Sequence, residues 1–352
     1  MKTDSFLRRV TPVSGLILAL TLGSAASADE VVYATTGGLM RQTLEEHFYK
    51  PFAKQTDSEI IPFDIELPDQ WARAEGMVRT GNVEFDIVTG TAPDLVDKTD
   101  ILLRVPCAEM PNIQKYALPG ACEEYGVART TGGMLISYDK DVYVDKAPVT
   151  WADFWDVETF PGPRGLPDTG DRDWWLPTVA LLADGVKKED LFPLDLDRAY
   201  KKLDEIRPHV TVWWKTGSQV QQIIRDREIA MTMAYSGRAL GSIKEGLNFG
   251  LSWDNALKDT GYFAILKDSP NPEGAVKFID FFYGNADGHP AFIRAVNYAT
   301  SSTIGVGMLP EEEQKLYATF PENYDKLVTP DFAWIGQNRD MLRERWTAWI
   351  TQ

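Results

Sequence analysis

Short apolar runs alternate with amphipathic helical segments along this chain, and this alternation limits the folds it can adopt. Residues 31–34 (VVYA) are typical of a buried strand, and residues 35–38 (TTGG) of a tight turn. An apolar side chain then recurs every four positions, which predicts one face of a helix, at Met40, Leu44, Phe48 and Phe52. Because such strand and helix units repeat, we expect an α/β fold with mainly parallel strands.

The first residues have the composition of an export signal. A basic leader with two adjacent arginines precedes an apolar segment at residues 13–23, and residues 24–28 (SAASA) supply the small side chains that signal peptidase requires. We predict a signal peptide over residues 1–28, cleaved after Ala28, and a periplasmic location. The adjacent arginines leave the Sec and twin-arginine routes both open. No later stretch has the length of a transmembrane helix, so the mature protein is not expected to span the membrane.

The charge of the chain argues against polyanionic partners. The formal net charge is −16, and removal of the signal peptide, with three basic residues and one acidic residue, makes it −18. A surface of this charge disfavours nucleic acid and anionic membranes as partners.

The chain has two cysteines, Cys107 and Cys122. In an exported protein we expect them to form one disulfide that closes a short loop. The three histidines lie far apart and in no ligand spacing, so no metal site is expected.

Sequence motifs of common catalytic sites are absent. The chain has no G-x-S-x-G, P-loop, G-x-G-x-x-G or H-E-x-x-H motif. We therefore expect neither a cofactor nor catalysis. An exported hydrolase with two carboxylates is the alternative from another class, because the sequence cannot rank pairs among 52 acidic residues.

Several phrases of the sequence resemble the polyamine-type periplasmic solute-binding proteins of ABC importers. These phrases occur in the family's order over essentially the whole mature chain, at residues 149–156 (VTWADFWD), 160–162 (FPG), 181–186 (LLADGV), 235–238 (YSGR), 274–281 (GAVKFIDF) and 297–300 (NYAT). The resemblance implies a two-lobe periplasmic-binding-protein type II fold with a hinged ligand cleft. It also implies a monomer that binds a small molecule and docks on an ABC permease in the inner membrane.

The order of the predicted elements fits one lobe interrupted by another. We expect crossings near residues 130–138 and 255–262. Lobe 1 then comprises residues 29–132 and about 258–300, and lobe 2 comprises residues 133–257. Residues 301–352 are expected to form C-terminal helices that pack across the lobes.

Loops at the carboxyl ends of strands are where open α/β sheets bind ligands. In lobe 1 this rule, together with the resemblance, selects Thr36, Gly37, Gly38, Thr89 and Thr91. The alternative is that these loops are merely tight turns.

The resemblance and the aromatic content select further cleft residues outside the lobe 1 loops, namely Arg172, Trp175, Trp214, Tyr235, Ser236, Arg238 and Tyr298. Adjacent indoles point to opposite faces of a strand, so only one of Trp213 and Trp214 can face the cleft. We expect Trp214 in the cleft and Trp213 in the core, because Trp214 lies nearer the end of the strand. For Arg172 the alternative is a surface salt bridge with a neighbouring aspartate, and for Arg238 a structural role in a loop.

Departures from the resembled family determine the expected ligand. Arg172 and Trp175, in residues 170–175 (GDRDWW), stand where polyamine binders have acidic residues, and Gly261 stands at another such position. A guanidinium binds carboxylates, phosphonates or sulfonates in a bidentate manner. We therefore expect a small anionic or zwitterionic solute, such as a 4-aminobutyrate-like amino acid, an opine-like conjugate or an organic acid. The alternative is a polyamine receptor with its acids at shifted positions, among them Asp173, Asp254 and Asp259. A sensor in place of a permease as partner also stays open.

Overall fold

The computed structural model describes residues 29–168, 170 and 173–352. The predicted signal peptide and Arg172 lie outside the described residues. The described strands form one mixed sheet in the order β2-β1-β3-β9-β5-β8-β6-β7, and β4 and β10 pair with β5. Their bounds are β1 Asp29–Thr35, β2 Ser58–Asp64, β3 Ile87–Thr91, β4 Cys122–Glu123, β5 Gly126–Asp139, β6 Arg164–Pro167, β7 Val210–Trp214, β8 Met231–Tyr235, β9 Phe249–Ile265 and β10 Ala299–Thr300.

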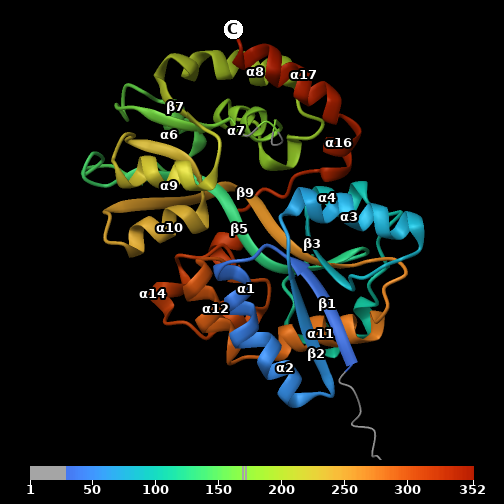
Figure 1. Cartoon of the computed structure of the whole chain (residues 1–352). Coiled ribbons are helices and arrows are strands. Elements are labelled where there is room, and N and C mark those ends of the chain that lie inside the picture. Colours follow the sequence, from blue (N-terminus) through green and yellow to red (C-terminus); the bar gives the residue numbers. More distant parts are fainter. Residues whose placement is uncertain (1–28, 169, 171–172) are drawn as a thin grey trace, which may run out of the picture.

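Strands β5 and β9 are the two long strands that connect the halves of the molecule (Figure 1). They pair antiparallel from Val127 opposite Phe263 to Asp139 opposite Phe249. On one side of this pair β1, β2 and β3 are mutually parallel, and on the other side β6, β7 and β8 are. The predicted crossings near residues 130–138 and 255–262 fall within these two strands, and the α/β type II fold is confirmed.

The helices of the first half cover both faces of β1, β2 and β3. Leu44, Phe48 and Phe52 are fully buried, which confirms the predicted helical face, although a π-helical turn interrupts that helix. The bounds are α1 Leu39–Leu44, η1 Glu45–Tyr49, α2 Lys50–Gln55, α3 Leu67–Thr80, α4 Ala92–Asp97, η2 Cys107–Glu109, α5 Pro111–Tyr116, α11 Pro272–Gly284, α12 Gly288–Val296, α13 Thr303–Gly307, α14 Glu311–Gln314 and α15 Pro321–Tyr324.

The second half has its own apolar core, in which Trp151, Trp155 and Trp214 are buried. The C-terminal residues run from the first core to the second: Tyr317 packs in the first, and Trp346 in the second. The bounds are α6 Trp151–Trp155, α7 Trp175–Ala183, η3 Lys188–Asp190, α8 Leu196–Ile206, η4 Arg207–His209, α9 Gly217–Arg225, α10 Ser236–Lys244, α16 Phe332–Gln337 and α17 Arg339–Ile350.

The predicted disulfide between Cys107 and Cys122 is present. It joins η2 to β4 next to the start of β5. Among the described residues, every helix is too short or too polar to cross a membrane.

A buried histidine makes the stability of the first half depend on pH. His289 is 0% exposed between the rings of Phe48 and Phe282, and its Nδ1 has no partner in the described part of the chain. Burial lowers the pKa of this imidazole to about 4, from about 6.5 in an unfolded chain. The folded state therefore excludes the charged form.

We predict that His289 costs stability in acid. This group leaves the free energy of unfolding unchanged above about pH 6.5. As the pH falls toward 4 the free energy of unfolding decreases, by about 2 kcal/mol at pH 5. Urea unfolding of the wild type and of His289→Gln at pH 7.5 and pH 5 measures this loss, because carboxylates titrate equally in both proteins. An equal stability difference between the two proteins at both pH values would contradict the prediction.

Candidate ligand-binding site

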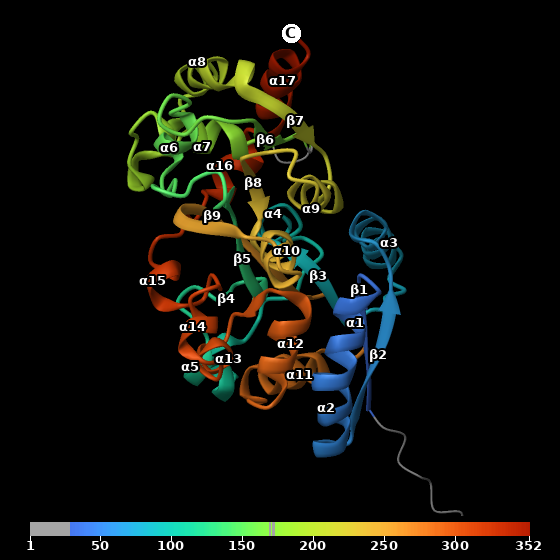
Figure 2. The ribbon, with the colours of Figure 1, turned by 90° about the vertical axis from the view of Figure 1, so that its left-hand side faces the viewer.

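A cavity of about 800 Å³, here called the interlobe cavity, lies between the two halves. Its lower wall comes from the start of α1 and the end of α12, and its upper wall from α9 and α10, which lie above them in Figure 2. Leu39, at the start of α1, is 59% exposed in this cavity and offers an apolar contact.

Five of the predicted site residues come together in the interlobe cavity, although they lie in separate parts of the sequence. They are Thr36, Gly37, Tyr235, Arg238 and Tyr298. Thr36 and Gly37 follow the carboxyl end of β1, and Tyr235 ends β8. The fold thus places strand ends from both halves at one cavity, as expected for an open α/β sheet.

The charged groups of the interlobe cavity favour an anion. Arg238 is exposed, its Nη1 donates to Gln221 Oε1 at 3.4 Å, and no carboxylate of the described residues lies within 4 Å of it. Lys244 donates to Asn297 Oδ1 at 2.8 Å and to the Tyr317 hydroxyl at 3.0 Å. Partial burial lowers the pKa of Lys244, and Glu313 partly opposes this effect.

The acid in the same cavity is already neutralised. Glu245 accepts two hydrogen bonds from Arg225, at 2.7 and 2.5 Å. The positive groups are therefore the ones left to attract a ligand.

A second cavity, here called the small cavity, has a volume of only about 10 Å³, which is room for about one water molecule. Its lining includes Thr91, Trp175 and Asp259. The Trp175 ring meets the Tyr235 ring edge-on, with centroids 5.5 Å apart, so these two aromatics connect the cavities. The Thr91 hydroxyl donates to Asp94 Oδ2 at 2.7 Å, which fixes the start of α4.

Thr89 occupies the carboxyl end of β3 and is held in place by its neighbours. Gln70 clamps its backbone, accepting from the Thr89 N–H at 3.0 Å and donating to its carbonyl at 2.8 Å. The Thr89 hydroxyl donates to Thr35 Oγ1 at 3.0 Å and accepts from Arg129 Nη1 at 3.3 Å. These polar groups form a fixed surface on the first half.

Three predicted residues are too buried to meet a ligand in this conformation. Trp175 is 2% exposed. Trp214 is 0% exposed and its Nε1 donates to the Met233 carbonyl, whereas we expected it in the cleft. The other face of β7 is covered as well, because Trp213 packs on α17, so neither indole reaches the cleft. Ser236 is buried and its hydroxyl accepts from the Gly133 N–H at 3.1 Å. Gly38 is exposed beside the interlobe cavity.

Two glycines that sequence reasoning missed position Tyr298. A Cβ on Gly237 would lie 2.2 Å from the Tyr298 ring, and a Cβ on Gly132 would lie 2.4 Å from it. The ring therefore packs against both β5 and the start of α10. Burial and the nearby Asp259 raise the pKa of the Tyr298 hydroxyl, so it stays neutral at physiological pH. The sequence signal for this contact is the glycine in YSGR, because a glycine at the start of a helix leaves room for a neighbouring ring.

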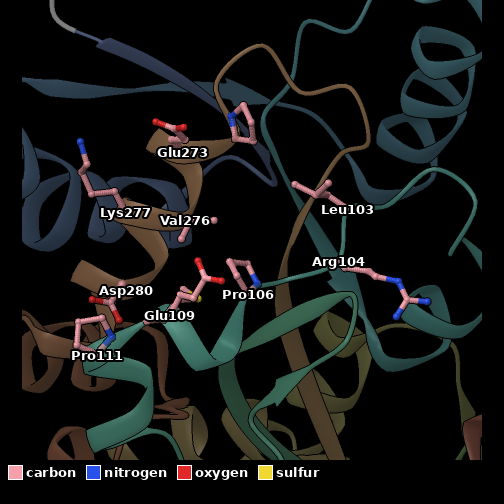
Figure 3. A pocket seen from close by; sticks show the side chains of 11 residues that line it. Leu103, Arg104, Pro106, Glu109, Pro111, Glu273, Val276, Lys277 and Asp280 are labelled. Atoms are coloured by element: carbon pink, nitrogen blue, oxygen red, sulfur yellow. The ribbon is translucent and has the colours of Figure 1, made fainter.

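Another cavity, of about 470 Å³, lies entirely in the first half (Figure 3). Figure 3 shows Val276 and Lys277 of α11 on one side of it and Pro106 and Glu109 on the other. Closure of the two halves cannot enclose this cavity, so it is a weaker candidate for the solute site. Within the described ranges, no group of histidine, cysteine, aspartate or glutamate side chains could hold a metal ion.

Comparison with known proteins points to one family. A family described as bacterial extracellular solute-binding protein matches residues 47–304. The gamma-aminobutyric acid-binding protein of Pseudomonas aeruginosa is 31% identical over 95% of both chains. The putrescine-binding periplasmic protein SpuD of the same species is 25% identical over 87% of this chain and 92% of its own. The structure of the Agrobacterium tumefaciens PBP AttC, open and unliganded, matches with a TM-score of 0.82 and 32% identity over 92% of this chain and 99% of its own.

The contact between Gly237 and Tyr298 gives a test of the junction between the halves. We predict that Gly237→Ala destabilises the fold by about 2 kcal/mol, because the new methyl group overlaps a ring that Gly132 blocks from behind. In a Tyr298→Ala background the same change should cost little or nothing, since the overlap is gone. Denaturant unfolding of the four proteins measures the coupling, and an equal cost in both backgrounds would refute this contact.

Proposed function

The chain belongs to the family of bacterial extracellular solute-binding proteins, and from that premise we propose that it captures a small anionic or zwitterionic solute between its lobes. It is a receptor of ABC-transporter type and not an enzyme, and proteins of this type bind a small molecule and deliver it to a permease. We further propose a periplasmic monomer, cleaved after Ala28, that docks on a permease in the inner membrane.

The observation that carries the ligand class is the excess of positive charge in the interlobe cavity. Arg238 and Lys244 face it, and the described part of the chain places no carboxylate within 4 Å of either. An arginine fork binds a carboxylate with two parallel hydrogen bonds. A solute carboxylate would thus pair with positive groups that have no carboxylate partner among the described residues.

A zwitterion would also use the aromatic side of the site. Tyr235 lines the interlobe cavity and is partly exposed, and the buried Trp175 ring supports it edge-on. An aromatic face attracts an ammonium group by roughly 0.5–2 kcal/mol. Together with the gamma-aminobutyric acid-binding relative, this arrangement supports a 4-aminobutyrate-like amino acid, ahead of an opine-like conjugate or an organic acid.

A polyamine is the second candidate. The putrescine-binding relative and the position of Asp259 beside Trp175 favour it. A diamine in the interlobe cavity, however, would place an ammonium group near Arg238 and Lys244.

We predict that the mature protein is stabilised by carboxylate-bearing solutes. A ligand that binds only the folded state raises the melting temperature by mass action, with about 2.7 kcal/mol at a concentration of 100 Kd. A thermal-shift screen with 4-aminobutyrate, succinate, an opine-like conjugate and putrescine, followed by calorimetry, tests this. Arg172→Ala should weaken the response to carboxylates. A response to putrescine alone, unchanged by that substitution, would favour the polyamine alternative.

We also predict a direct role for Arg238. Arg238→Ala should weaken binding of the best carboxylate ligand at least about tenfold, equivalent to about 1.4 kcal/mol, because a charge-assisted hydrogen bond is lost. Arg198→Ala is the matched control, since this exposed arginine of α8 pairs with Asp184 outside the interlobe cavity. Calorimetry that finds equal affinities for the two variants would contradict this role.

A further inference from the structure

Arg129 is the extra residue of a bulge at the junction of the halves. Along β5, Ala128 lies opposite Tyr262 and Thr130 lies opposite Gly261, so Arg129 has no partner on β9. A bulge redirects the side chain of the inserted residue, and bulges are frequent next to functional sites. Here the guanidinium lies among Tyr33, Thr89 and the Phe263 ring, whose centroid is 5.8 Å from the guanidinium carbon.

This guanidinium is buried, and the described residues supply no counterion for it. Arg129 is 5% exposed, and its Nη1 donates to the Tyr33 hydroxyl and to Thr89 Oγ1. Its Nε has no hydrogen-bond partner, and across the described ranges no carboxylate lies within 4 Å of the group. An unpaired buried charge costs several kcal/mol. Two neutral hydroxyls offset only part of this cost, so the arrangement lacks an anion.

Gly261 brings no side chain against one side of this guanidinium. A Cβ at Gly261 would lie 3.4 Å from Arg129 Nη2 and 3.1 Å from Thr130 Oγ1. Gly261 is partly exposed, and its φ lies outside the left-handed region, so a side chain there would crowd Thr130 and Arg129 without straining the backbone. Gly261 is also the strand partner of Thr91, which lines the small cavity. The side of the guanidinium that faces Gly261 is thus adjacent to two residues of the small cavity, Thr91 and Thr260.

We propose that Arg129 and Gly261 form a carboxylate subsite at the floor of the cleft. The solute's carboxylate rests on Gly261 and accepts a hydrogen bond from Arg129 Nη2, while Tyr33 and Thr89 hold the guanidinium by Nη1. Arg129 then specifies the acid end of the solute from the first lobe, and Arg238 attracts it from the second. This inference rests on the proposed function, because it assigns an atom-level role within the same cleft.

The neighbouring hydroxyls support this role by fixing the guanidinium in advance. Thr89 is held through its backbone by Gln70 and through its hydroxyl by Thr35. A donor held before binding loses little conformational freedom when the ligand arrives.

Gly261→Ala is the decisive variant because it leaves Arg129 in place and only narrows the space next to Arg129 Nη2. We expect its Kd for 4-aminobutyrate to rise at least about tenfold with an unchanged melting temperature in the absence of ligand. Gly76→Ala is the matched control, since a Cβ there meets nothing closer than 4.0 Å, and it should bind as the wild type does. Arg129→Lys keeps the charge without the fork and should lose a similar factor.

Gly261→Asp supplies a readout that a purely structural arginine would not give. Its carboxylate would occupy the place of the solute's carboxylate next to Arg129. We expect it to abolish 4-aminobutyrate binding and to improve binding of putrescine. Calorimetry with both solutes on the wild type, Gly261→Ala, Gly76→Ala, Arg129→Lys and Gly261→Asp completes the test.

The outcomes separate the two proposals. If the wild type binds 4-aminobutyrate and Gly261→Ala and Arg129→Lys bind it equally well, the subsite is wrong and the proposed function stands. If the wild type binds no carboxylate solute, both are wrong. Should Arg129→Lys fail to fold, Gly261→Ala alone decides.

Discussion

The antiparallel pairing of β5 with β9 is the interaction on which the rest of this structure depends. These strands make the sheets of both halves continuous, and they carry the chain from one half to the other. Small residues occupy the point of crossing, including Gly132, Gly133 and Gly261. Because Gly132 lacks a side chain, the Tyr298 ring can pack on β5 from one side. At Gly261 the absence of a side chain would let a solute approach the strand backbone and Arg129 next to it.

The charge of the cleft is independent of the charge of the whole chain. The protein is strongly acidic, yet its interlobe cavity holds Arg238 and Lys244 without carboxylate partners in the described part of the chain. A site partly shielded from water strengthens each of these interactions compared with the exposed surface. A solute carboxylate that meets Arg129 on one lobe and Arg238 on the other would stabilise the closed form more than the open form. That differential affinity is the physical requirement for ligand-driven closure.

Features that depend on local periodicity could be predicted from the sequence. The helical face of Leu44, Phe48 and Phe52, the α/β order and the disulfide all follow from spacing and composition. The place of Trp214 did not follow, because strand alternation gives two faces but not what covers them. Trp214 lies against Tyr235 and Met233 of β8, and α17, which covers the Trp213 face, lies more than 120 residues later in the chain. Arg129 also escaped prediction, since its direction comes from a bulge that only the pairing of β5 with β9 creates.

In this proposal, the fold fixes the positions of the crossing strands, and a few side chains on those strands determine the class of ligand. At position 261 an acidic side chain would pair with Arg129 and leave the cleft floor neutral or negative, which suits an amine. Glycine at the same position leaves the guanidinium uncovered, which suits an acid. The change introduces no left-handed backbone strain, because the φ of Gly261 lies outside that region. A single position can therefore reverse the sign of the preferred ligand charge while the crossing strands and both cores stay the same.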